Sequence, residues 1–264
     1  MSRAAPDVWN RLAVGATLGW VALIFTGAST TGLLRAPVNN PWLFPVTYHV
    51  HRISGIVVGV LAVFVLIRGG SQGPRHWIGA ALVGATVALG WVSQSFAPPI
   101  VAVHAFIAAF AGVPLTAATR LAKAGASGPV SPRPRWVRVF AQVAFGLVSA
   151  QVAAGALLRH QQISLVTHLL LGGIAVLTLL VPAAATLQDP AASMAARSAA
   201  RWAIAAVITQ VALGVAVLIM ILVGPPSLLA WLGATIAHVT VGTLTLLAAA
   251  GFAAVDVPSP VKSR

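Results

Sequence analysis

Long apolar stretches, separated by short polar connections, constrain the fold of this 264-residue chain more than any other feature. A helix needs about 20 mostly apolar residues to cross the hydrocarbon core of a bilayer. Only 7% of the residues are charged, whereas an ordinary soluble domain carries about 25%. So few charges cannot cover a water-exposed surface. The sequence therefore predicts an all-α, polytopic membrane protein surrounded by membrane lipid.

Eight apolar stretches are expected to span the membrane. They run roughly over 9–32, 45–68, 76–95, 98–119, 136–159, 163–187, 199–223 and 227–253. The first stretch follows Arg3, so a secretory signal peptide is an alternative interpretation. The stretch is longer than the apolar part of a signal peptide, which favours a membrane helix.

Positive charges are distributed unevenly between the two sides of the expected spans. The chain carries 16 Lys and Arg against three acidic residues, and all the cations except Arg35, Arg52 and Arg159 fall on one side. Cytoplasmic connections of membrane proteins are enriched in Lys and Arg. We therefore expect a multi-pass protein of the cell inner (cytoplasmic) membrane with both termini in the cytoplasm. No nucleic-acid partner is expected, because the charges lie in the short connections.

The two halves of the chain share an order of features. In each half, the first stretch ends in Leu-Leu-Arg, the second has a His followed four residues later by a Gly, and the fourth has a His after a Pro-Pro pair. Pro, Gly, Ser and basic residues separate the halves. We expect two pseudo-symmetric four-helix bundles, 1–122 and 136–264, joined by a cytoplasmic linker over 123–135.

Four histidines lie inside the second, fourth, sixth and eighth apolar stretches: His51, His104, His168 and His238. A polar ring in hydrocarbon is usually functional, although a hydrogen bond between helices is the alternative. Four histidines at matching places favour ligation of a metal or haem. The chain has no Cys or Glu, so thiolate ligands are excluded. Two imidazoles can fill both axial positions of a haem iron between apolar helices.

Other residues near these histidines suit a haem. Arg35, Arg52 and Arg159 are candidates to pair with the haem propionates, or to anchor the chain at the interface. His160 is a further candidate near the propionates, and His49 is either a substitute ligand or a propionate neighbour. The glycines that follow two of the histidines allow close approach of a haem or of a second helix, and these readings stay equal: Gly55, Gly59, Gly172 and Gly173.

Taken together, these residues resemble the haem A synthase family of integral membrane proteins. The resemblance covers nearly the whole chain. It rests on four features: His51-Arg52, Pro98-Pro99 before His104, the run from Leu157 to His160, and the histidines of the second half. It implies oxidation of a methyl group of haem O to a formyl group, which yields haem A for terminal oxidases. It also implies that His51 and His104 surround haem O, while His168 and His238 ligate a haem b.

Tyr48 stands three residues before His51, where the family typically carries a catalytic Glu. The resemblance makes Tyr48 the candidate catalytic residue, although a phenol is a poor base at neutral pH. Many members of the family also have a Cys pair in the first outer loop, and this chain has none. A non-catalytic haem-binding or b-type electron-transfer membrane subunit is therefore the alternative function. Expected partners are haem and lipid, with a haem O synthase, a terminal oxidase or a larger respiratory complex.

Overall fold

The computed structural model describes residues 6–35, 42–69, 74–93, 97–123 and 133–255. These residues form eight α-helices and no strand. The helices are α1 (Pro6–Arg35), α2 (Leu43–Gly69), α3 (Pro74–Val92), α4 (Pro98–Lys123), α5 (Arg135–Arg159), α6 (Leu165–Gln188), α7 (Met194–Val223) and α8 (Leu228–Ala253). The predicted all-helical fold is confirmed.

Seven of the described helices are long and apolar enough to cross a membrane. The exception is α3, whose apolar part, Trp77–Val92, is shorter than the others. Many large apolar side chains on the helices face outward, among them Leu18, Val60 and Leu170. Exposed apolar surface on this scale is unfavourable in water, so the outer surface is consistent with a multi-pass membrane protein.

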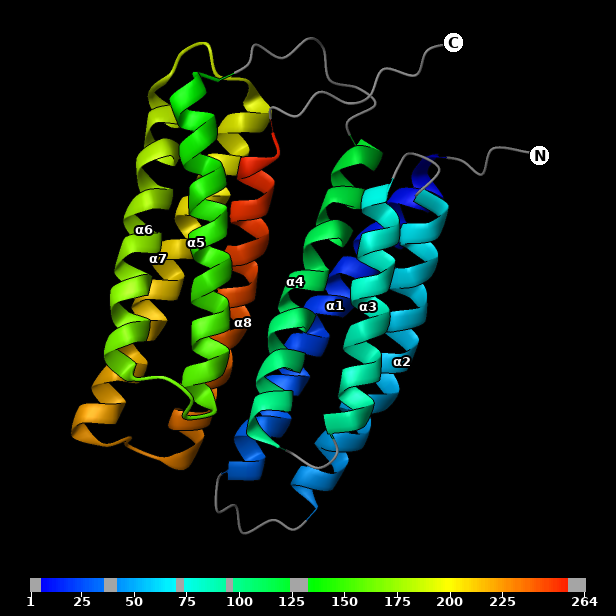
Figure 1. The fold of residues 1–264 in the computed structure, drawn as a ribbon, viewed down its shortest axis with the longest axis vertical. Helices are drawn as coiled ribbons and strands as arrows, with labels where there is room; N and C mark the ends of the chain where they lie inside the picture. Colours follow the sequence, from blue (N-terminus) through cyan, green and yellow to red (C-terminus); the bar gives the residue numbers. More distant parts are fainter. Residues whose placement is uncertain (1–5, 36–41, 70–73, 94–96, 124–132, 256–264) are drawn as a thin grey trace.

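Consecutive helices run up and down, with α1 to α4 on one side of the molecule and α5 to α8 on the other (Figure 1). The first four helices bury one apolar cluster, which includes Trp20, Leu66 and Leu115. The other four, together with Ala109 of α4, bury a second cluster around Leu179 and Leu246. Helices α1, α4, α5 and α8 make the contacts between the two sets.

Alanine makes up nine of the 14 buried residues of the second cluster and four of the ten of the first, and these small residues let the helices approach closely. Trp20 is the largest buried side chain of α1, and its indole Nε1 donates to the carbonyl of Ala108 in α4 over 2.7 Å. A buried indole N–H is usually hydrogen-bonded, and the apolar side chains around it offer no acceptor, so the backbone carbonyl of Ala108 fills that need. This hydrogen bond fixes α1 against α4.

Three of the later helices begin at a serine whose hydroxyl accepts a backbone N–H of the first turn: Ser164, Ser193 and Ser227. The cap at Ser193 starts α7 at Met194, five residues earlier than the apolar pattern predicts. The same helix stops at Gly224, whose φ of +94° is a conformation that glycine adopts without steric cost.

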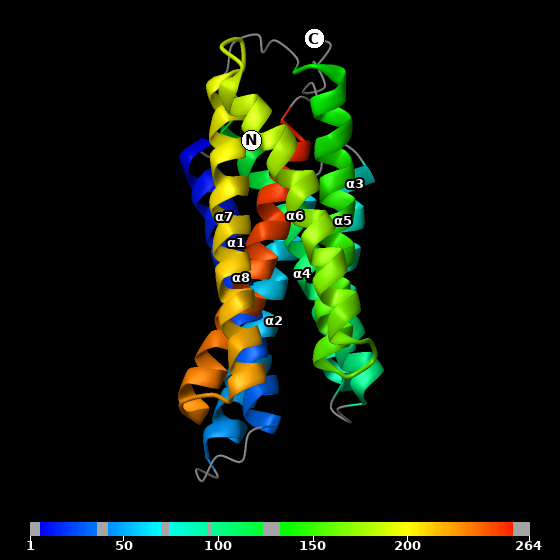
Figure 2. The ribbon, with the colours of Figure 1, turned by 90° about the vertical axis from the view of Figure 1, so that its left-hand side faces the viewer.

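Odd-numbered helices finish, and even-numbered helices begin, at one end of the molecule, which we call the distal end. The connections from α5 to α6 and from α7 to α8 lie there (Figures 1 and 2). The described start of α1 and end of α8 lie at the opposite, proximal end. Residues placed early in α2, α4, α6 and α8 are therefore gathered toward the distal end.

Candidate functional site

The four histidines singled out by the sequence meet in two pairs. His51 of α2 and His104 of α4 have ring centroids 6.5 Å apart, with the ring planes at 83°. His168 of α6 and His238 of α8 have centroids 6.4 Å apart, with the planes at 75°. Each half of the chain thus supplies one pair of nearly perpendicular imidazoles. His168 lies in the first turn of its helix, closer to the helix start than the other three.

Each imidazole packs against a glycine of the preceding helix. The four contacts are Gly27 with His51, Gly90 with His104, Gly155 with His168 and Gly214 with His238. A Cβ atom at these glycines would lie 2.9, 3.0, 3.3 and 3.1 Å from the Cε1 atom of the ring, respectively. A side chain larger than hydrogen would push the ring aside, most strongly at Gly27. The glycines of the odd-numbered helices therefore leave the space that the imidazole rings occupy. The sequence interpretation did not identify these glycines.

Hydrogen bonds set the protonation of the first pair. The hydroxyl of Thr26 donates to the carbonyl of Leu23 over 3.1 Å, and the same oxygen lies 3.0 Å from Nδ1 of His51. A hydroxyl has one proton, so while that proton is donated to Leu23 the Thr26 oxygen is placed to accept the Nδ1–H of His51. Nδ1 of His104 lies 3.1 Å from the carbonyl oxygen of Thr86, which can only accept. Both rings then carry their proton on Nδ1 and keep the lone pair of Nε2 for a ligand.

The second pair has glutamine partners instead. Nε2 of Gln151 lies 3.2 Å from each ring nitrogen of His168. Nε2 of Gln210 lies 3.3 Å from Nε2 of His238. The sequence interpretation missed both glutamines, although a polar residue inside an apolar span was available as a signal.

Arg52 and Tyr48 are bound to each other beside the first pair. Nη1 of Arg52 donates to the Tyr48 hydroxyl over 3.1 Å, and the guanidinium lies 4.2 Å from the ring centroid of Trp91. Tyr48 also stacks on Phe44, with centroids 5.8 Å apart. Tyr48, the candidate catalytic residue of the sequence interpretation, is therefore held by aromatic contacts and a cation. Neighbouring His49 is exposed, with its ring edge-on to Tyr48.

Arg159 joins the two halves of the chain. Its Nη2 donates to the carbonyl of Ala28 in α1 over 2.8 Å. His160 caps α5 and is 5% exposed. The side chain of Arg35, the third candidate cation of the sequence interpretation, lies outside the described part of the structure.

The glycines that follow the histidines divide into two kinds. Gly55 and Gly173 have nothing within 4 Å of the place that a Cβ atom would take, so they leave open space. Gly59 faces Val87 of α3, and Gly172 faces the amide of Gln151. Gly59 and Gly172 therefore make room for neighbouring side chains of the protein.

The two Leu-Leu-Arg runs lie at different distances from the glycines that contact the histidines. The difference is about one helical turn. Gly27 and Gly155 hold corresponding rings, yet Arg35 follows Gly27 by eight residues while Arg159 follows Gly155 by four. One α-helical turn takes about 3.6 residues. Arg35 therefore stands about one turn further along its helix than Arg159 does.

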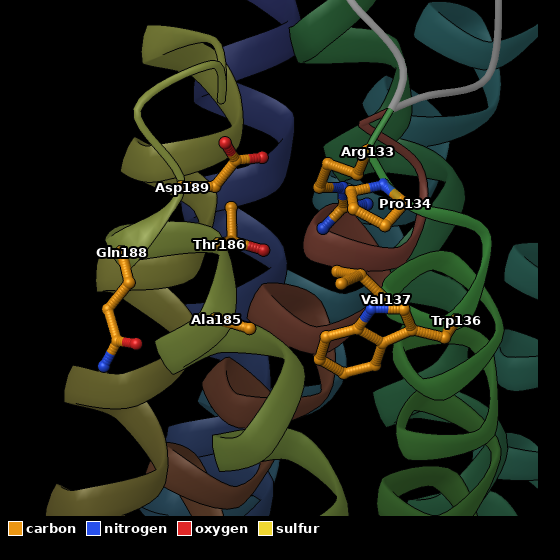
Figure 3. Close-up of a pocket in the computed structure, with 8 residues that line it drawn as sticks. All are labelled: Arg133, Pro134, Trp136, Val137, Ala185, Thr186, Gln188 and Asp189. Carbon is orange, nitrogen blue, oxygen red and sulfur yellow. The ribbon is translucent and has the colours of Figure 1, made fainter.

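A separate cavity of about 310 Å³ lies at the proximal end, between the start of α5 and the end of α6. Its lining residues are Arg133, Pro134, Trp136, Val137, Ala185, Thr186, Gln188 and Asp189 (Figure 3). Ala185 is 17 residues along α6 from His168, which corresponds to about 25 Å of helix. Arg133 is 3% exposed and donates to the carbonyl of Phe252, so it closes the end of α8. The cavity is therefore not part of the histidine pairs.

Within the described ranges, no three or more His, Cys, Asp or Glu side chains come together to hold a bare metal ion. The histidines meet only two at a time. The chain matches no protein-family model, and no curated protein sequence matches it significantly.

Proposed function

We propose that the chain is a haem A synthase-like membrane oxidoreductase that holds two haems, one between His51 and His104 and one between His168 and His238. The observation that carries this proposal is the spacing of the two histidine pairs. Haem iron takes its four equatorial ligands from the macrocycle, so a protein supplies a complete site with two imidazoles.

The spacing of the rings fits such a site. Imidazole nitrogens bind metal ions at about 2.0–2.1 Å, and the ring centre lies about 1.2 Å behind the nitrogen, so two imidazoles that hold one haem iron between them would have ring centres about 6.4–6.6 Å apart. The observed separations are 6.5 and 6.4 Å. A direct hydrogen bond between the two rings would bring them closer than this. In the first pair, the lone pairs on Nε2 of His51 and His104 are left for a ligand, which agrees with haem ligation.

The shared contact pattern supports two pseudo-symmetric four-helix bundles. In both halves, the second and fourth helices supply the histidines, and the first and third supply the glycines behind them. The charge distribution supports the cytoplasmic placement of the proximal end and both termini in a cell inner membrane. Arg52 and Arg159 then lie on the outer side, where they are suited to haem propionates.

The resemblance assigns the first pair to the substrate haem O and the second to a haem b. Haem supplies oxygen-dependent and one-electron chemistry when bound. The protein's contribution at the first pair is to orient His51 and His104 and to place Tyr48 beside them. An external oxidant and electron donor are needed to take a methyl group to a formyl group.

A second candidate, a b-type electron-transfer subunit, is favoured by the surroundings of Tyr48. Its hydroxyl accepts a hydrogen bond from Arg52. Among the side chains that the structure describes, the one carboxylate, Asp189, lies at the proximal end. Electron transfer requires no base at the position of Tyr48, whereas methyl oxidation by the family mechanism uses a carboxylate there.

Pigment analysis of the purified protein, produced with a source of haem O, tests both candidates. The measurements are reduced-minus-oxidised spectra and chromatography of the extracted haem. We expect two haems per chain, with haem A or its alcohol precursor in the extract. His49→Ala is the matched control, because His49 is exposed and two residues from His51.

The outcomes separate the two candidates. Haem b or unchanged haem O alone would favour the electron-transfer function. A colourless protein would contradict the haem ligation on which both candidates depend. Loss of haem from the His49→Ala variant would contradict the assignment of His51 as the ligand.

A further inference from the structure

Two glutamines distinguish the second histidine pair from the first. Gln151 of α5 and Gln210 of α7 each lie four residues before the glycine that contacts a histidine of the second pair. The corresponding positions of the first pair are Leu23 and Thr86. Glutamine is costly inside a membrane helix unless its amide is hydrogen-bonded. Its presence at both matching positions therefore calls for a physical role.

Neighbouring glycines make room for the two amides. A Cβ at Gly172 would lie 2.9 Å from Nε2 of Gln151, and a Cβ at Gly242 would lie 3.2 Å from Nε2 of Gln210. Any larger residue at Gly172 would force the amide to move. Each glutamine is thus held against its imidazole by a glycine placed four residues after the histidine, on the same helix.

Each glutamine amide also has a buried oxygen that accepts no hydrogen bond from the described residues. Oε1 of Gln151 and Oε1 of Gln210 are buried and have no hydrogen-bond partner among the described residues. An unsatisfied buried acceptor costs about 1–3 kcal/mol. A half-turn of the amide exchanges the positions of Nε2 and Oε1. At Gln151 this turn would place an acceptor about 3.2 Å from the ring nitrogens of His168.

A histidine that binds a metal normally donates its other ring N–H to an acceptor, which orients the ring and raises its basicity. Thr26 and the carbonyl of Thr86 supply that acceptor in the first pair. We propose that Gln151 is the positioning residue that accepts the ring N–H of His168. Gln210 differs, because its amide lies 3.3 Å from Nε2 of His238 while Nδ1 of His238 has no hydrogen-bond partner among the described residues. This inference rests on the proposed haem ligation. It assigns the second pair a side-chain acceptor that a substitution can remove.

The test uses the full-length protein with Gln151→Leu, which introduces the residue of the first pair, and Gln151→Glu, which keeps an acceptor and removes the donor. The measurements are haem titration, the reduction midpoint potential and the low-spin ferric electron paramagnetic resonance signal. Gln188→Leu is the control, because Gln188 is exposed at the proximal end of α6. The haem of the first pair reports that each variant is folded.

We expect Gln151→Leu to weaken the binding of the second haem about 10- to 100-fold. The midpoint potential of that haem should become more positive, because a less basic ligand stabilises ferric iron less. Gln151→Glu should retain the haem and shift the potential in the opposite direction.

Two results would overturn the inference while leaving the proposed function intact. The first is an unchanged second haem in Gln151→Leu. The second is a Gln151→Glu variant whose potential moves in the same direction as that of Gln151→Leu, since a side chain that only fills space would behave in this way. A wild-type protein that takes up no haem would instead overturn both the inference and the proposed function.

Discussion

The two histidine pairs share their backbone framework and differ in their polar partners. In both pairs the rings are nearly perpendicular, about equally spaced, and packed on glycines of the preceding helices. The first pair is oriented by a Thr26 hydroxyl and a backbone carbonyl, and the second by two glutamine amides. Helix packing therefore sets the ring separation, while a few side chains set the chemistry of each pair.

The largest expected effect comes from removing one pair at a time. His51→Ala with His104→Ala should remove one haem completely, and His168→Ala with His238→Ala should remove the other. The haem-to-protein ratio by pyridine haemochrome measures both. Loss of both haems from either double variant would show that the two pairs do not act as independent sites.

The glycine contacts should make the first pair more sensitive to added volume. Gly27→Ala places a Cβ 2.9 Å from the ring of His51, whereas Gly155→Ala leaves 3.3 Å to the ring of His168. We expect Gly27→Ala to reduce the binding free energy of the first haem by about 1–3 kcal/mol. Gly155→Ala should have a smaller effect on the binding of the second haem. Haem titration measures both losses.

Matched controls for these substitutions lie on the same helices. Gly15 of α1 and Gly146 of α5 have nothing within 4 Å of an added Cβ, so their alanine variants should bind haem normally. Equal losses of haem affinity in Gly27→Ala and Gly155→Ala would contradict the expectation that the ring with less space around it is affected more.

The hydroxyl at the first pair provides the next test. Thr26→Val keeps the shape of the side chain and removes the acceptor for Nδ1–H of His51. We expect the first haem to bind about 10-fold more weakly, with the second unchanged. Thr17→Val is the control, because the Thr17 hydroxyl bonds only within its own helix. An unchanged first haem in Thr26→Val would mean that this hydrogen bond does not orient the ring.

The smallest effect concerns the link between the two halves. Arg159→Ala removes the hydrogen bond to Ala28, whose neighbour Gly27 contacts His51. We expect a loss of about 1 kcal/mol of stability, seen as a lower Tm in detergent, with both haems retained. Arg201→Ala, an exposed position in α7, should leave the Tm unchanged. A lost first haem in Arg159→Ala would show that the bridge also positions the first pair.

The sequence by itself determined the helical class, the positions of the helices and the four paired histidines. Apolar runs report directly on membrane helices, since the cost of burying unpaired polar groups in lipid leaves few alternatives. The clearest departures from that prediction are the shorter apolar part of α3 and the earlier start of α7, while α1 and α4 also extend three to four residues beyond the expected spans. These departures lie at helix ends, where capping by residues such as Ser193 competes with the apolar pattern.

The tertiary structure alone decided what surrounds each imidazole. Contacts such as Gly27 with His51, Gln151 with His168 and Arg159 with Ala28 join residues on different helices. Those contacts depend on how each helix is rotated and shifted along its axis against its neighbour. Apolar periodicity fixes these quantities poorly in a membrane helix, because its lipid-facing and core-facing sides are both apolar.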